Sequence, residues 1–257
     1  MIITEQWLRH WVDTDLSVNE ISDVLTHAGL EVDAVESIEL PDSKVVIGEI
    51  VAVKQHPDAD RLQVCQVSDG KNNHQVVCGA PNARIGIKVA FAPVGAELPG
   101  TKIKKAKLRG VESFGMLCSG EELGLYSPID GLLKLPTEMT TGQPLAEALG
   151  GMDHTIDIDL TPNRGDCLSV LGVARELRVL RGAKVKNLPA DAVEQSSGAA
   201  ISIDNQEPAL CTSYRARVIE GINRDAVTPL WMAERLQRSG IKPIHPVVDI
   251  TNYVMLE

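Results

Sequence analysis

A block of short β-branched segments between residues 45 and 100 restricts the possible folds of this chain more than any other feature. The segments read "VVIGEIVAVKQ", "RLQVCQVSDG", "HQVVCGA" and "KVAFAPVG". Turn-forming pairs separate or follow them, at Pro57-Asp58, Asp69-Gly70, Pro81-Asn82 and Pro99-Gly100. About five strands joined by short turns within roughly 100 residues predict a small closed barrel or a sandwich.

The segments on either side of this block have the pattern of a mixed α/β fold. "SVNEISDVLTHAGLE" predicts a helix, because Ser17 and Glu20 have the spacing of a capping box and an apolar stripe follows. "LEVDAVESIEL" and "HTIDIDL" alternate like strands. "LSVLGVARELRVLRG" predicts a second amphipathic helix. Its buried side is expected to carry Leu168, Leu171, Ala174 and Leu177.

A third unit begins near Ile201, after a linker-like stretch over residues 187–199. We expect a strand in "YRARVIEGI" and then a helix with Thr228 as N-cap and Pro229 at its first position. The last residues, "HPVVDITNYVMLE", are apolar and stop without a closing turn. This end indicates either a piece of a longer protein or a C-terminus packed into the core.

The charge of the chain is distributed unevenly. The net charge of −10 and the pI of about 5.1 argue against a nucleic-acid footprint over the whole surface. The segment from Arg84 to Arg109 nevertheless has a local charge of +6. Such a segment is typical of a face that contacts a polyanion, but lysines that guard a sheet edge produce the same pattern. The seven cations are Arg84, Lys88, Lys102, Lys104, Lys105, Lys107 and Arg109.

These seven residues are our candidate RNA-binding set. Lysine and arginine side chains suit phosphate groups, and small barrels often bind oligonucleotides on one face and its loops. Phe114 is the one aromatic residue close to the basic run, which is poor support for stacking on single-stranded bases. Contact with the backbone of a folded RNA fits the pattern better.

Several other functions lack support in the sequence. No apolar run approaches the roughly 20 residues that a membrane span needs, and the N-terminus lacks a secretory signal pattern. The five cysteines form no CxxC pair, which favours a reduced cytoplasmic protein without a zinc site. GxSxG, Walker A and HExxH motifs are all missing. The residues therefore favour a binding module over a complete enzyme.

One short motif allows two interpretations. In "QHPDADRLQV", His56, Asp58 and Asp60 alternate and could ligate a metal ion. Pro57 and the two aspartates are also ordinary turn residues. Three ligands are few for a site that binds a hard cation. We therefore predict a structural turn and no metal site.

Three long stretches coincide with a known family. They read "VVIGEIVAVKQHPDADRLQV", "VVCGAPNARIGIKVAFAPVGAELPG" and "KIKKAKLRGVESFGMLCSGEELGL". They resemble the tRNA-binding OB-fold module that several aminoacyl-tRNA synthetases share with tRNA-binding accessory proteins. The flanks include "DIDLTPNRGDCLSVLGVARELRVL" and "GINRDAVTPLWMAERLQRSGIKPIHPVVDITNYVMLE", and they are similar to the bacterial phenylalanyl-tRNA synthetase β subunit. The resemblance covers nearly the whole chain.

The resemblance implies an α+β multidomain fold. A five-stranded OB-type barrel over residues 41–149 would be inserted into a small α/β domain, formed by residues 1–40 with 150–195. Residues 200–257 would be the incomplete start of an α/β editing domain. The change of pattern at both borders of the barrel agrees with this division.

The resemblance also implies a function for the parent enzyme. That enzyme would be a cytoplasmic α2β2 ligase of protein biosynthesis, which attaches phenylalanine to its tRNA on the α subunit with ATP and Mg²⁺. Its β subunit would remove wrongly attached tyrosine, and Thr251 and Asn252 match positions that line the family's editing pocket. For this chain we expect tRNA and the α subunit as partners, no bound cofactor, no complete catalytic site and no activity alone. The alternatives are a structural or protein-interaction module and a free-standing tRNA-binding accessory protein.

Overall fold

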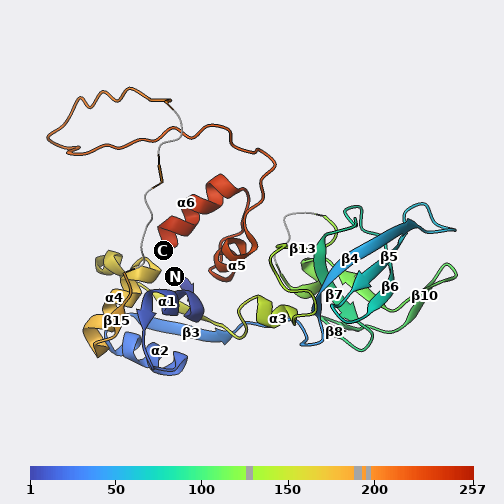
Figure 1. The fold of residues 1–257 in the computed structure, drawn as a ribbon. Helices are drawn as coiled ribbons and strands as arrows, with labels where there is room; N and C mark the ends of the chain where they lie inside the picture. Colours follow the sequence, from blue (N-terminus) through green and yellow to red (C-terminus); the bar gives the residue numbers. More distant parts are fainter. Residues whose placement is uncertain (126–129, 188–192, 195–197) are drawn as a thin grey trace. The chain divides into compact units, whose positions relative to one another are not determined.

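The structure is a computed structural model that describes residues 1–125, 130–187, 193–194 and 198–257 (Figure 1). Its contacts divide the chain into two units, one formed by residues 1–186 with 227–257 and the other by residues 187–226. The first unit contains a mixed α/β layer, a β-barrel and two C-terminal helices. The predicted fold class, a mixed chain with a five-stranded barrel, is confirmed; the exact domain borders stay predictions.

A three-stranded antiparallel sheet joins segments from both sides of the barrel sequence. β14 (His154–Asp159) lies in its centre and pairs with β1 (Ile2–Thr4) and β3 (Glu31–Ser37). A smaller ladder pairs β2 (Val12–Asp13) with β15 (Lys184–Val185). The strand that follows the barrel thus completes a sheet begun before it.

Three helices complete this layer. They are α1 (Glu5–Trp11), α2 (Val18–His27) and α4 (Val170–Arg181). The predicted capping box of α2 is present, because the Ser17 hydroxyl accepts from the Glu20 N–H and the Glu20 carboxylate accepts from the Ser17 N–H. The helices bury apolar side chains against the sheet in one cluster that includes Trp7, Leu8, Ile21, Leu25, Ile156 and Leu177.

The apolar stripe of α4 differs from the sequence prediction. Leu168 is 58% exposed, whereas Val170 and Val173 are fully buried. The reason is the cap: the Ser169 hydroxyl accepts from the Gly172 N–H, so the helix begins at Val170 and Leu168 lies before it. Ala174 and Leu177 are buried as predicted.

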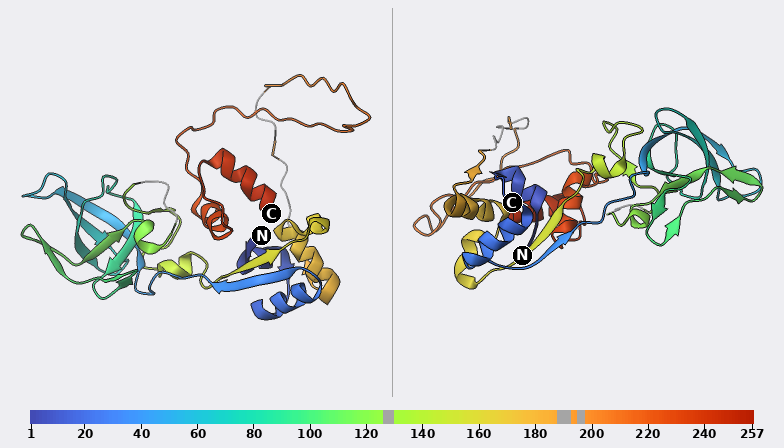
Figure 2. Two further views of the ribbon diagram at one scale, coloured as in Figure 1. Left: turned by 180° about the vertical axis from the view of Figure 1, so that it is seen from behind. Right: turned by 90° about the horizontal axis from the view of Figure 1, so that it is seen from below.

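The barrel consists of five main antiparallel strands in the order β12-β7-β4-β5-β6. Views from two further sides show these strands curving around a common core (Figure 2). Two hydrogen bonds connect β6, at one edge of the sheet, to the residues just before β12, at the other edge. The Phe114 N–H donates to the Gln75 carbonyl (2.8 Å), and the Val77 N–H donates to the Ser113 hydroxyl (3.0 Å). The strands are β4 (Val46–Gln55), β5 (Gln63–Ser68), β6 (Asn73–Cys78), β7 (Lys88–Pro93) and β12 (Gly115–Cys118).

Two short hairpins extend from this barrel. β8 (Glu97–Leu98) pairs with β9 (Thr101–Lys102), and β10 (Ala106–Leu108) pairs with β11 (Val111–Ser113). The remaining short elements are η1 (Glu121–Leu123), β13 (Lys134–Leu135), α3 (Leu145–Ala148) and η2 (Pro162–Cys167).

The C-terminal part of the first unit consists of α5 (Leu230–Arg238) and α6 (Pro246–Leu256). The predicted N-cap of α5 is wrong by one residue, because Pro229 occupies that position and the Thr228 hydroxyl instead donates to the buried Asp249 carboxylate. No helix among the described residues has both the length and the apolar character needed to cross a membrane.

The second unit, residues 187–226, has neither helix nor strand among its described residues. The strand predicted in residues 214–222 is therefore wrong for this structure. The β-branched residues there are mostly exposed, with Ile219 71% accessible, and no strand ladder includes this segment among the described residues.

Candidate nucleic-acid interface

The β10–β11 hairpin carries the most exposed part of the basic segment. Leu108 pairs with Val111, so Arg109 and Gly110 form a two-residue loop. Both loop residues have positive φ, 45° at Arg109 and 89° at Gly110, which is the requirement of a type I′ turn. The turn therefore presents the Arg109 side chain at the tip of the hairpin.

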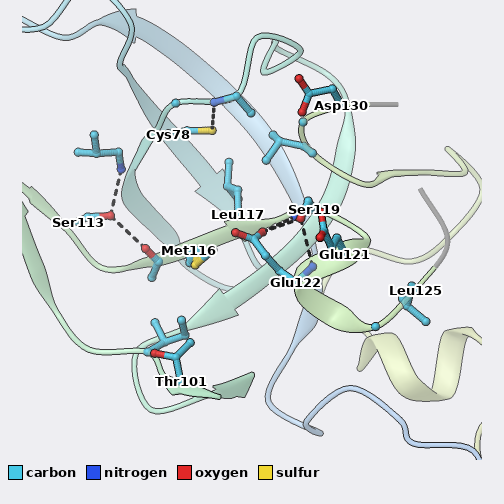
Figure 3. Close-up of a pocket in the computed structure, with 18 of the residues that line it drawn as sticks. Cys78, Thr101, Ser113, Met116, Leu117, Ser119, Glu121, Glu122, Leu125 and Asp130 are labelled. Atoms are coloured by element: carbon cyan, nitrogen blue, oxygen red, sulfur yellow. Dashed lines mark hydrogen bonds between the residues drawn. The ribbon is translucent and has the colours of Figure 1, made fainter. Parts of the chain in front are cut away.

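Some cations of the basic segment line a hollow on the barrel, and others do not. Lys102 and Lys104 line a hollow on the barrel, together with Leu108, whereas Lys105 and Lys107 do not line it. Figure 3 draws other residues that line this hollow, among them Thr101, Met116 and Glu122. The cations of the basic run therefore do not all line this hollow.

Two of the seven candidate cations are paired with carboxylates. The Lys102 ammonium lies 2.8 Å from Glu97, across the β8–β9 hairpin, and the Lys105 ammonium lies 2.8 Å from Glu112. Lys105 also lies 4.8 Å from the centroid of the Phe114 ring. All four charged side chains are about half exposed or more, so these pairs are labile contacts in water.

A third candidate, Lys88, has a structural role. Its ammonium donates to the carbonyl oxygen of Thr137 at 2.6 Å and also to that of Met139. It thereby holds the loop after β13 against β7. A phosphate could bind the Lys88 ammonium only by replacing both hydrogen bonds. Lys88 is therefore a weaker candidate for RNA binding than the cations of the hairpin.

Four candidates keep their charge toward solvent. Lys104 and Lys107 are exposed and form no ion pair within the described residues, and Arg84 is exposed in the loop before β7. Arg109 is also exposed, and its guanidinium reaches the Asp58 carbonyl at a long 3.5 Å. These cations remain available to a polyanion.

His56 contributes to this surface in a way that the sequence did not reveal. The ring is 3% exposed, and its Nδ1 accepts from the Asp58 N–H at 3.1 Å. Its Nε2 therefore carries the proton and donates to the Leu108 carbonyl at 3.1 Å. The motif with His56 and Asp58 is a turn that anchors the basic hairpin.

One carboxylate-rich cluster has a metal-like composition elsewhere, at Asp166, Cys167 and Glu176. Its centre is taken by the Arg164 guanidinium, which lies 2.9 Å from Glu176 and 3.0 Å from the Cys167 sulfur. Burial raises the pKa of the Cys167 thiol to about 11, so the group stays protonated at neutral pH. This cluster is an ion-pair network that braces η2 against α4.

The two editing-pocket candidates are neighbours on α6 but do not share a face, because adjacent helical residues are about 100° apart. Thr251 is exposed, and its hydroxyl donates to the Val248 carbonyl at 2.6 Å. Asn252 is half-buried. The buried Asp249 of the same helix is held by the Thr228 hydroxyl and by the Ile244 N–H.

Comparison with known proteins adds independent information. Residues 45–144 match the family model described as "Putative tRNA binding domain", and residues 210–257 match the B3/4 domain. The chain is 52% identical over its whole length to the phenylalanine–tRNA ligase beta subunit of Pseudomonas putida and 51% identical to that of Hahella chejuensis. It covers 32% and 33% of those two proteins, so it spans about a third of the length of the curated relatives it matches.

Among solved structures, the C-terminal domain of Plasmodium vivax p43 matches with a TM-score of 0.30 and 22% identity. The match covers 40% of this chain and 59% of that one. This similarity is too low to bear on the fold or the function.

Proposed function

This chain belongs to the phenylalanine–tRNA ligase β-subunit family, and from that premise we propose that its barrel binds the phosphate backbone of tRNA. The parent enzyme would attach phenylalanine to its tRNA in the cytoplasm, with ATP and Mg²⁺ used on a partner α subunit in an α2β2 assembly. The chain described here supplies RNA-binding surface and does not charge tRNA alone.

The observation that carries the proposal is the exposed β10–β11 hairpin. It lies within the residues matched by the tRNA-binding family model. Its cations Lys107 and Arg109, and Lys104 two residues before β10, are exposed in a chain whose net charge is −10. Flexible ammonium groups act as point charges toward phosphates, and arginine adds a forked donor. A local basic surface on an acidic protein attracts RNA to one place.

The scarcity of aromatic groups indicates which kind of RNA contact is made. Phe114 is the one aromatic residue in the hairpin region, and the Lys105 ammonium lies over its ring. Proteins that bind single strands without sequence preference usually stack several bases on aromatic side chains. Contact with the backbone of a folded RNA needs only the cations.

A pair of double variants tests the proposal. Lys104→Gln with Lys107→Gln removes one cation just before the hairpin and one within it, whereas Lys71→Gln with Lys134→Gln removes two exposed cations elsewhere on the barrel. We expect the first variant to weaken tRNA binding by about tenfold or more at low salt, with the second close to wild type. Equal losses in both variants would contradict a role of the hairpin.

Residues 210–257 match the B3/4 domain, and we infer that Thr251 and Asn252 contribute to an editing site only in the full-length β subunit. In this fragment the Thr251 hydroxyl is already bonded within α6. We expect the purified chain neither to aminoacylate tRNA nor to hydrolyse tyrosyl-tRNA. Measurable turnover of either substrate by the chain alone would refute this.

One observation favours a second candidate function. The cations do not all line the same hollow, and two of them are paired with glutamates, as in a solvated surface or a protein interface. The barrel would then support assembly with the α subunit. Co-purification of this chain with that subunit, lost in the Lys104→Gln/Lys107→Gln variant, together with unchanged tRNA binding, would favour this alternative.

A further inference from the structure

Glu112 lies on β11 of the basic hairpin, next to two lysines of the other arm. Its carboxylate is 2.8 Å from the Lys105 ammonium, and its position on β11 is directly opposite Lys107 on β10. Directly opposite residues in an antiparallel pair have side chains on the same face. One exposed carboxylate is therefore flanked by two lysines.

The charge of Glu112 persists at neutral pH. The hydrogen bond and the charge of Lys105, and then the charge of Lys107, lower the pKa of this carboxyl group below its usual value. The face therefore carries a fixed negative group among its cations, and the attraction that Lys105 can offer to another anion is reduced.

The position of Lys105 is also restrained from a second side. Its ammonium lies 4.8 Å from the centroid of the Phe114 ring, while it contacts Glu112. Lys105 and Glu112 are each about half exposed, at 52% and 49%. An ion pair with this exposure is weak, so an incoming phosphate can replace the carboxylate as the partner of Lys105.

We propose that Glu112 is an internal counter-anion of the RNA-binding face, which takes the place of a backbone phosphate between Lys105 and Lys107 and so limits the affinity for RNA. The inference rests on the proposed function, since it concerns the same hairpin. The consequence is that the resting face is partly neutralised, and only an RNA that also contacts Lys104 or Arg109 displaces Glu112 efficiently.

The variant Glu112→Gln tests this role. Glutamine keeps the length and shape of the side chain on β11 but removes its charge. We expect tRNA binding by the full chain to become about two- to fivefold tighter at low salt, the range of one exposed charge contact. The slope of log affinity against log salt should stay near that of wild type, because RNA displaces Glu112 in the wild-type complex and the number of phosphate contacts is the same.

A matched variant separates this effect from a change of net charge. Glu36→Gln removes an exposed carboxylate from β3, outside the barrel. We expect it to leave the tRNA affinity near that of wild type. A gain in this variant equal to that of Glu112→Gln would overturn the proposal.

A further variant identifies the lysine that is released. In the Lys105→Gln background the Glu112→Gln substitution should add little affinity, because the freed partner is gone. If the gain persists in full, Glu112 does not act through Lys105 and the proposal is wrong.

The failure of this inference is distinguishable from the failure of the proposed function. If Lys104→Gln/Lys107→Gln weakens tRNA binding while Glu112→Gln binds like wild type, the hairpin binds RNA but Glu112 is no counter-anion. If neither the wild-type chain nor Glu112→Gln binds tRNA, both proposals are overturned. Thermal unfolding of each variant, expected within about 2 °C of wild type for these exposed positions, shows that the fold is retained.

Discussion

The imidazole of His56 joins the turn after β4 to the carbonyl oxygen of Leu108, the last residue of β10, at 3.1 Å. This bond fixes the base of the loop that carries Arg109. The ring is buried and receives a second bond from the Asp58 N–H, so its orientation is set by both nitrogens. A core-facing side chain thus determines where a surface hairpin lies.

Replacing His56 should therefore weaken RNA binding without unfolding the barrel. His56→Ala removes two hydrogen bonds and leaves the Leu108 carbonyl without its partner, a loss of about 1–3 kcal/mol in the free energy of unfolding. Hydrogen exchange of the amides in residues 106–113 should become faster. The affinity for tRNA should decrease in the same variant. Unchanged exchange in this hairpin would contradict the anchoring role.

The β5–β6 turn provides a pH-dependent contribution to stability. Partial burial opposes ionisation of Asp69, but bonds from the Asn72 N–H, the His74 ring and the Lys71 N–H lower its pKa to about 2, from an ordinary value of 3.8. Because the folded-state pKa is the lower one, the contribution is complete above about pH 4 and is lost as the pH falls toward 2.

Asp69→Asn should remove this acid-dependent contribution. We expect the variant to lose about 1–2 kcal/mol of unfolding free energy at pH 7 and to lose less stability than wild type between pH 4 and pH 2.5. Urea unfolding across this pH range measures both. If the free energy of unfolding depends on pH in the same way in the variant and in the wild type, Asp69 does not have this role.

Gly172 permits the close approach of α4 to η2. A Cβ atom at this position would lie 2.2 Å from the Asp166 carbonyl oxygen and 2.9 Å from the Cys167 Cα, both backbone atoms that cannot move aside cheaply. Gly172→Ala should therefore destabilise the α/β layer by about 2–4 kcal/mol, although alanine is the better helix former. Gly165→Ala, where the structure leaves open space, is the matched control and should cost less than 1 kcal/mol.

Tyr253 connects α6 to the N-terminal layer. Its ring stacks on Trp7 with centroids 4.8 Å apart, while its hydroxyl accepts from the Arg235 guanidinium at 2.7 Å and donates to Glu257 at 2.9 Å. Tyr253→Phe keeps the stacking but removes both bonds, and we expect a loss of about 1–3 kcal/mol in urea unfolding followed by tryptophan fluorescence. Tyr253→Ala should cost more, since it also removes the ring.

Local signals predicted much of the fold. The capping box of Ser17 and Glu20 marked the start of α2 because its reciprocal bonds depend only on residues three apart. The barrel strands were visible because β-branched runs and turn pairs alternate between residues 45 and 100, and the tRNA-binding model matches residues 45–144. These features can be predicted without knowing which distant residues are in contact.

The charge of the interface was visible in the sequence, but its geometry was not. Seven cations could be counted, yet the two-residue turn at Arg109 and Gly110 decides that Glu112 falls opposite Lys107. The spacing "KAKLRGVE" contains that register, because Arg-Gly between two short alternating runs indicates a hairpin, and this signal could have identified Glu112. The bond from His56 to Leu108 spans 52 residues, so no local pattern reports it.

The most direct test of the account is the salt dependence of tRNA binding by the wild-type chain. Lys104, Lys107 and Arg109 each offer one phosphate contact, with Lys105 as a fourth once Glu112 is displaced. The account predicts a slope of log affinity against log salt between about −2 and −4, at roughly 0.7 to 0.9 for each contact. A slope near zero, or no binding even at low salt, would contradict it.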